Sequence, residues 1–126
     1  MIVLDSGGLS RLAARTKTSV SLIRALTAQE LWPPLVPTMV LVESLYGHGR
    51  RGANTHRLLK TCIIESTVTV DVARRAVELR RLARRGSAVD ALVVAIAEPG
   101  GTVLTGDRAD IEALAAHADR VSVDVI

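Results

Sequence analysis

Four acidic residues lie at positions that the surrounding apolar sequence predicts to be buried, where a charge is unfavourable. Asp5 directly follows the short apolar run at 2–4, and Asp107 follows a similar run at 102–104. Glu43 and Asp90 each interrupt a segment that is otherwise too apolar for a solvent-facing helix. A lone buried carboxylate is destabilising unless it is neutralised, paired or bound to a metal. Four such acids therefore predict a shared counter-ion.

The ligand chemistry of these acids favours a divalent cation. Carboxylate oxygens suit Mg²⁺, with Mn²⁺ as an alternative, and do not suit soft metals. Cys62 is the single cysteine, and His48, His56 and His117 are predicted to lie in loops or on the surface, which excludes a cysteine or histidine metal site. Before a cation enters, neighbouring carboxylates should raise the pKa of one another.

Short strands and longer helices alternate along the chain. The predicted strands cover residues 2–4, 35–37, 63–65, 102–104 and 121–125, the last at a sheet edge. The predicted helices cover residues 9–15, 19–31, 38–46, 52–61, 71–85, 88–97 and 109–117. This alternation predicts one domain, 1–126, of the α/β class, built as a three-layer α/β/α sandwich with a mainly parallel central sheet. In such sheets, reacting groups gather beyond the carboxyl ends of the strands.

Two of the predicted helices differ in character. The helix at 38–46 is apolar nearly all round, which predicts that it is buried with Glu43 near its middle; Thr38 is predicted to cap it, as Ser87 caps the helix at 88–97. The helix at 71–85 carries arginines opposite an apolar stripe. We interpret those arginines as a solvated face rather than a phosphate-binding surface.

Composition limits the functional classes. The chain has 126 residues, 48% hydrophobic content and a formal charge of +3, and fourteen of its sixteen basic residues are arginine. Arginine binds phosphates in bidentate fashion, although genome composition produces the same bias. The single cysteine suits a reducing cytoplasm, and no apolar run approaches the roughly 18 residues of a membrane span. We therefore predict a cytoplasmic protein without membrane contact.

The motifs around the four acids resemble those of the PIN-domain nucleases, and within them the VapC toxins of bacterial toxin–antitoxin pairs. The resemblance covers the whole chain. It rests on Leu4-Asp5-Ser6, on Pro37-Thr38 followed by Glu43, on Ala88-Val89-Asp90-Ala91-Leu92, and on Val103-Leu104-Thr105-Gly106-Asp107. Two features depart from the family pattern: Gly7-Gly8 follows the first acid, and Glu98-Pro99-Gly100 shortens the segment after the third motif.

The resemblance implies a PIN-like fold and a Mg²⁺-dependent endoribonuclease that leaves a 5′-phosphate and a 3′-hydroxyl. It implies a catalytic quartet of Asp5, Glu43, Asp90 and Asp107. Asp5, Asp90 and Asp107 would contact the metal, and Glu43 would act on it directly or through water. Secondary candidates are Ser6 and Thr105, whose hydroxyls would lie near the metal, and Asp110, which is a ligand, an outer-shell group or a helix cap. Arg108 is the candidate for phosphate contact with RNA.

The resemblance also implies partners. These are an RNA substrate, a cognate antitoxin that places a basic side chain in the acidic groove, and a second copy of the chain in a homodimer. The candidate antitoxin surface is the helix pair from 9 to 32. We expect its apolar residues to be more than the core can cover; they are Leu12, Leu26, Leu31 and Trp32.

Three alternatives remain open. A PIN-like domain with an inert site would act as an RNA-binding or regulatory module. A phosphoryl-transfer enzyme of the haloacid-dehalogenase type is suggested by Gly106-Asp107 with Asp110, but position 7 is glycine where that class has a second aspartate. A phospho-acceptor receiver domain likewise lacks its paired acids and its late lysine.

Overall fold

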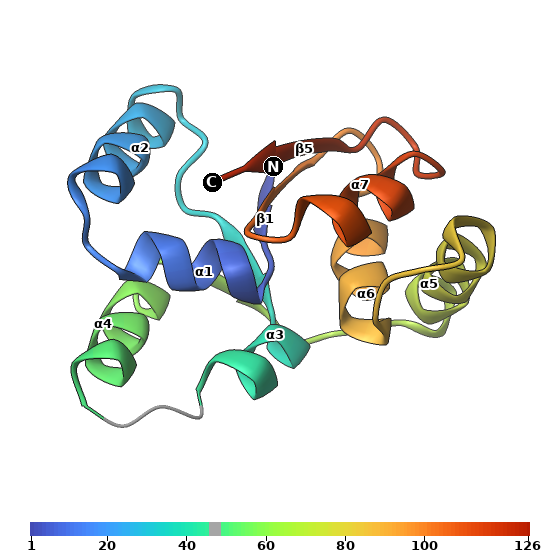
Figure 1. The fold of residues 1–126 in the computed structure, drawn as a ribbon, viewed down its shortest axis with the longest axis horizontal. Coiled ribbons are helices and arrows are strands. Elements are labelled where there is room, and N and C mark those ends of the chain that lie inside the picture. The colour runs from blue at the N-terminus through green and yellow to red at the C-terminus, as the bar shows by residue number, and fades with distance from the viewer. Residues whose placement is uncertain (46–48) are drawn as a thin grey trace.

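A single parallel sheet forms the centre of the protein (Figure 1). The computed structural model describes residues 1–45 and 49–126. Within them the sheet has five strands in the order β3-β2-β1-β4-β5, and every pairing is parallel. The strands are β1 (Ile2–Leu4), β2 (Leu35–Pro37), β3 (Ile63–Glu65), β4 (Thr102–Thr105) and β5 (Ser122–Val125).

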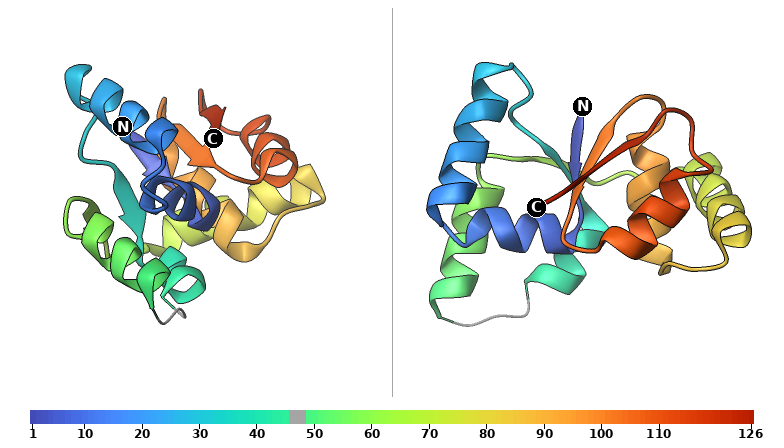
Figure 2. Two further views of the ribbon diagram at one scale, coloured as in Figure 1. Left: turned by 60° about the vertical axis from the view of Figure 1, so that its left-hand side comes forward. Right: turned by 45° about the horizontal axis from the view of Figure 1, so that its top comes forward.

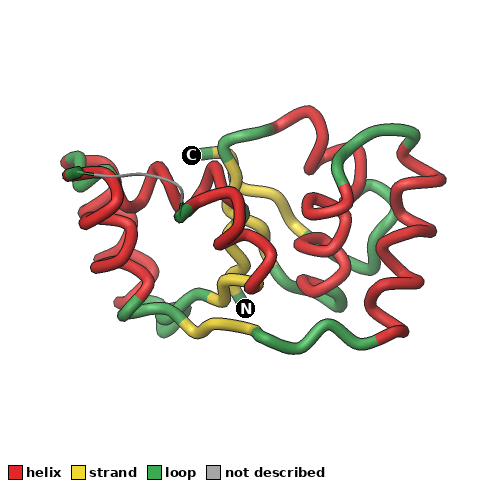
Figure 3. Tube along the Cα trace, turned by 90° about the horizontal axis from the view of Figure 1, so that it is seen from below, coloured by secondary structure: helices red, strands yellow, loops and turns green. Residues whose placement is uncertain are grey.

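Helices cover both faces of the sheet, which makes a three-layer α/β/α sandwich (Figures 2 and 3). One layer is α1 (Ser6–Ala13), α2 (Lys17–Ala28), α3 (Thr38–Ser44) and α4 (Arg50–Leu59). The other is α5 (Val70–Ala83), α6 (Ala88–Ala97) and α7 (Arg108–Ala115). The chain moves outward from β1 to β3 and then crosses back to β4, so right-handed crossovers place the later helices on the opposite face. The predicted fold class is confirmed.

The strand that delivers Asp5 lies at the centre of the sheet. Ile2, Val3 and Leu4 are all buried, and β1 pairs with β2 on one side and β4 on the other. A strand covered on both faces reads as a continuous apolar run, as this one does. β5 lies at one edge, as predicted, with most of its residues exposed.

The beginning of α3 differs from the prediction. Pro37 precedes its first turn without a side-chain cap, and the Thr38 hydroxyl instead donates to the Glu65 carbonyl at 2.8 Å. The burial predicted for this helix is wrong: Val40 is its one buried residue, and Val42 is 82% exposed. Tyr46, the predicted end of the helix, lies outside the described residues.

Two surface predictions have opposite outcomes. Ala76 and Leu79 on α5 face the core, which confirms the predicted apolar stripe. The excess apolar surface predicted for the helix pair from 9 to 32 is not found, because Leu12 and Leu26 are buried in the core. Leu31 and Trp32 are half-buried against the same core. No helix among the described residues is long and apolar enough to cross a membrane.

Candidate functional site

Asp5 is a buried carboxylate at the carboxyl end of the central strand. Its side chain is 4% exposed. It caps α1, because its Oδ1 accepts a hydrogen bond from the Gly8 amide at 2.6 Å. The helix therefore begins at Ser6 rather than at the predicted Leu9, since the acid itself satisfies the first turn. Asp5 therefore both ends the central strand and caps α1.

Two glycines bring the Asp5 loop against the end of β4. A Cβ on Gly8 would lie 2.2 Å from the Leu104 carbonyl oxygen, and a Cβ on Gly7 would lie 2.8 Å from the Gly106 amide nitrogen. No larger side chain fits there without moving the backbone. The Gly7-Gly8 departure from the family pattern thus has a packing explanation.

Thr105 joins the loops that carry Asp5 and Asp107. Its buried hydroxyl donates to Oδ2 of Asp5 and accepts from the Asp107 amide at 2.8 Å. Asp107 itself is exposed and caps α7, with its Oδ1 3.4 Å from the Asp110 amide. The two strand-end acids predicted from sequence are therefore connected through one side chain.

The pKa of Asp5 is raised above its ordinary value. Burial is the main cause, since it disfavours the charged form. The Gly8 and Thr105 hydrogen bonds oppose this shift, and the carboxylates of Asp90 and Asp107 add to it. Asp90 and Asp107 therefore act on Asp5 electrostatically, with no positive side chain among the causes of its shift.

Asp90 has a structural role in addition to its charge. It is the third residue of α6 and forms a capping box with Ser87: the Asp90 amide lies 3.0 Å from the Ser87 hydroxyl, and Asp90 Oδ2 accepts from the Ser87 amide at 2.9 Å. The predicted cap by Ser87 is confirmed. One carboxylate oxygen of Asp90 is used in this box, which leaves Oδ1 for another partner.

Glu43 differs from Asp5 in its exposure and in the surface that it lines. It is exposed on α3 and does not contribute to the pKa shift of Asp5. It lines a cleft of about 540 Å³ together with Ser6, the first residue of α1. Asp5, Asp90 and Asp107 do not line this cleft. The predicted burial of Glu43 is therefore wrong, and its membership of the acidic quartet stays a prediction.

The remaining candidates have partners of their own. Asp110 forms an ion pair with Arg85 at 2.6 Å, which holds its carboxylate toward α5 rather than toward Asp5. Arg108 is exposed and lies 3.5 Å from Glu112 one turn along α7. It also lines a second cleft of about 460 Å³ beside β5. His56 and His117 are exposed, as predicted, and His48 lies outside the described residues.

The acids meet some requirements of a Mg²⁺ site and leave one unmet. Their donors are all carboxylate oxygens, and the pKa of Asp5 is raised mainly by burial and in smaller part by Asp90 and Asp107, so a cation bound there would stabilise the charged form. In residues 1–45 and 49–126, however, no three Asp, Glu, His or Cys side chains are gathered closely enough to hold a metal ion. The donor chemistry and electrostatics fit the cation, and the ligands are not assembled around it.

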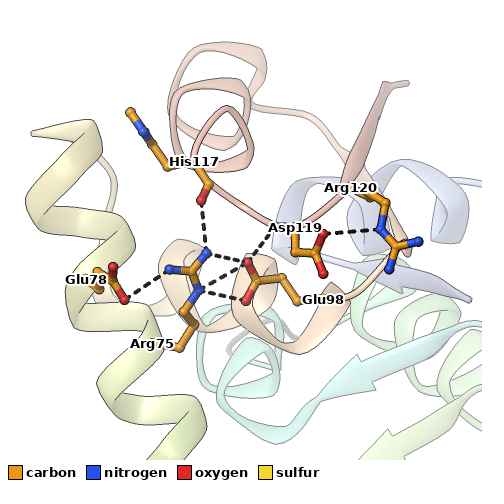
Figure 4. Close-up of polar contacts among 6 residues, drawn as sticks. All are labelled: Arg75, Glu78, Glu98, His117, Asp119 and Arg120. Carbon is orange, nitrogen blue, oxygen red and sulfur yellow. Dashed lines mark hydrogen bonds and ion pairs between the residues drawn. The ribbon is translucent and has the colours of Figure 1, made fainter.

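Sequence reasoning missed the best-paired acid of the protein, Glu98 (Figure 4). Its carboxylate accepts from Nε and Nη2 of Arg75 at 2.8–3.1 Å and from the Asp119 amide at 2.7 Å. Arg75 also contacts Glu78 and the His117 carbonyl. The pKa of Glu98 is lowered, mainly by Arg75. Arg75, interpreted as a solvated residue, instead connects α5 with α6 and the turn before β5.

Comparison with known proteins adds no family to these observations. No family model matches the chain, and a search of curated proteins gives no match.

Proposed function

We propose that the protein is a metal-dependent endoribonuclease that hydrolyses RNA phosphodiesters with Mg²⁺. The observation that carries the proposal is the uncompensated carboxylate of Asp5, buried at the end of the central strand with a raised pKa and with Asp90 and Asp107 as its charged neighbours. Strand ends of open parallel sheets are where such enzymes place reacting groups. Perturbed carboxylates at such a position are typical of functional sites.

Asp5, Asp90 and Asp107 are the residues that would hold the cation. Bound there, a divalent cation supplies Lewis-acid stabilisation of the charge that develops on the phosphodiester. Gly8 and Thr105 fix the orientation of Asp5, and Asp107 is exposed at the loop where a water molecule and the RNA can approach. Glu43 lines a cleft together with Ser6 and would act from there.

The test is a cleavage assay on a panel of folded and unstructured RNAs, with Mg²⁺ or Mn²⁺ and then with chelator. Wild-type protein should cleave with metal and leave a 5′-phosphate and a 3′-hydroxyl. Asp5→Asn should lose at least about 10²-fold in rate, which is the scale of losing one positioned catalytic group. Asp71→Asn is the matched control, because Asp71 is exposed on α5. Undiminished cleavage in chelator, or full activity of Asp5→Asn, would contradict the proposal.

The second candidate is a module that binds RNA without cleaving it. Both oxygens of Asp5 already accept hydrogen bonds, and the described acids are not assembled as a ligand set. Such a protein would bind the same RNAs in the same assay and leave them intact with every divalent metal.

The toxin role and the antitoxin partner rest on the family resemblance. Expression of the wild-type chain alone should arrest growth, and the Asp5→Asn chain should not. Co-expression with the neighbouring reading frame should yield an inactive complex. Harmless overexpression of an active nuclease would remove the toxin role and leave the nuclease proposal intact.

A further inference from the structure

The larger cleft lies between α1, α3 and α4, and it includes the candidate residues Ser6 and Glu43. Its volume is about 540 Å³. Its polar lining comes from all three helices: Ser6 and Ser10 from α1, Glu43 and Ser44 from α3, and Arg50, Arg51 and Asn54 from α4. A cleft of this size with several convergent polar groups is typical of a ligand site.

Two arginines give one wall of the cleft a positive charge. Arg50 and Arg51 occupy the first turn of α4, are exposed, and form no ion pair within the described residues. Cations are unfavourable at a helix N-terminus, where the helix dipole is already positive. The first turn contains no acid, and Gly49 provides no side-chain cap. Dipole and arginines therefore combine into a site that attracts an anion.

A second feature of the cleft is an unsatisfied hydroxyl. The Ser44 Oγ is buried and lacks a hydrogen-bond partner within the described residues. An unpaired buried hydroxyl is unfavourable, and such groups usually have a partner that is missing from the structure. Ser44 belongs to the same cleft as the arginines. The positive charge of the arginine wall is the feature of the cleft that an anionic ligand would meet directly.

The protein has little aromatic surface for holding nucleic-acid bases. It has no Phe, and its one tryptophan, Trp32, packs against the core. Single-strand binders that recognise bases commonly use exposed aromatic side chains. Tyr46 lies outside the described residues. Recognition through the sugar-phosphate backbone is therefore favoured over recognition through stacked bases.

We propose that this cleft binds the phosphodiester backbone of an RNA through Arg50 and Arg51, which deepens the nuclease proposal and rests on it for the identity of the polymer. Ser6 follows Asp5 directly in the sequence and lines the cleft, so a strand bound there lies beside the Asp5 loop. The Glu43 carboxylate, which also lines the cleft, would repel a small free anion bound there. A polymer can place its phosphates against the arginine wall and continue past the acid.

The test measures binding of wild-type protein in chelator, where cleavage does not contribute. The probes are a single-stranded RNA of about 12 nucleotides, within the range of known site sizes, an abasic oligodeoxynucleotide of the same length, and inorganic phosphate as competitor. The variant is Arg50→Gln with Arg51→Gln. The matched control is Arg57→Gln with Lys60→Gln, which removes the same charge from the exposed far end of α4.

RNA and the abasic strand should both bind. The Arg50/Arg51 double variant should bind each strand about tenfold or more weakly at low salt. The slope of the logarithm of the binding constant against the logarithm of salt concentration should become shallower by about 1.4, which is 0.7 for each lost phosphate contact. The control should keep both values. Ser10→Asp, which adds a carboxylate to the cleft from α1, should also weaken binding without altering α4.

Other results would overturn the proposal. Equal losses in the control pair would mean that only net charge matters. Inorganic phosphate should displace RNA less well than the abasic strand at the same total phosphate concentration. Equal displacement would mean that the cleft binds a single anion. Because binding is measured without metal, these outcomes are independent of the cleavage assay: loss of cleavage with retained Arg50/Arg51-dependent binding would sink only the nuclease proposal.

Discussion

Asp5 and Glu98 are two largely buried acids at the ends of secondary-structure elements, and their surroundings shift their pKa values in opposite directions. Glu98 has Arg75 and the Asp119 amide as donors, and its pKa is lowered (Figure 4). Asp5 has one amide and one hydroxyl as donors, and its pKa is raised. No cation of the described chain compensates Asp5, whereas Glu98 is compensated fully.

The contrast separates a structural acid from a candidate functional one. A partly buried acid with an arginine partner completes its own ion pair and needs nothing from outside. A buried acid with further acids nearby retains a charge that only an external cation or a proton can neutralise. The position of an acid in the sequence did not reveal this difference, and the identity of its neighbours in space does.

The largest effect should follow from displacing Asp5. Gly8→Ala places a Cβ 2.2 Å from the Leu104 carbonyl oxygen, so α1 or β4 must move. We expect a loss of about 3 kcal/mol in the free energy of unfolding, on the scale of overpacking, together with loss of cleavage. Denaturant unfolding measures the change. Ser10 on the same helix is exposed, so the control Ser10→Ala should change the free energy of unfolding by no more than about 0.5 kcal/mol. A Gly8→Ala protein as stable as wild type would contradict the close packing of the two loops.

Removing the partner of Glu98 should have the next largest effect. Arg75→Ala leaves the Glu98 carboxylate, whose side chain is 13% exposed, without its main donor. Loss of hydrogen bonds to a charged group predicts a decrease of about 2 kcal/mol in stability, with cleavage per folded molecule unchanged. The exposed neighbour Arg74 provides the control through Arg74→Ala. If both variants are equally stable, the Arg75–Glu98 pair does not stabilise the fold.

The same pair predicts a dependence on pH. Because the pKa of Glu98 is lowered in the folded state, its contribution to stability is present above its ordinary value of 4.5 and disappears as pH falls through the folded pKa. Wild type should be more stable than Glu98→Gln at pH 7, and the difference should shrink at an acidic pH below 4.5, as pH falls through the lowered folded pKa. Parallel unfolding curves at the two pH values measure this; a constant difference would contradict it.

Neutralising Asp5 should have a smaller effect of the opposite sign. Asp5→Asn removes a charge whose pKa is raised by burial, and the amide can still accept from Gly8 and reach Thr105. We expect a gain on the order of 1 kcal/mol at pH 7. The gain should vanish as pH falls through the raised folded pKa toward 3.8, where wild-type Asp5 is also protonated. Destabilisation at pH 7 would show that the Asp5 charge is compensated after all.

Much of the fold was predictable, because apolar runs and helix periodicity are local signals. The strands at 35–37 and 63–65 and the helix at 88–97 have the predicted bounds. The position of Asp5 at a strand end followed from the same signals. What failed depends on distant contacts: Glu98 and Arg75 are 23 residues apart, and the partner of Asp110 is Arg85, 25 residues away.

Helix α3 shows another limit of sequence reasoning. Its apolar residues predicted burial on all sides, but the fold places this short helix at the surface, where Val42 and Glu43 are exposed. The hydrophobicity of a helix does not by itself predict how much of its surface other elements of the fold will cover. The predicted burial of Glu43 failed for this reason, and Glu43 lines a cleft together with Ser6.

The most direct test of the contrast between Asp5 and Glu98 is the effect of Mg²⁺ on stability. Denaturant unfolding of wild type, Asp5→Asn and Glu98→Gln would be measured in chelator and in increasing Mg²⁺. A cation that binds only the folded state at ten times its dissociation constant should stabilise wild type by about 1.4 kcal/mol. We predict that increase for wild type and Glu98→Gln and none for Asp5→Asn. The same increase in Asp5→Asn, or no increase in wild type, would contradict the account.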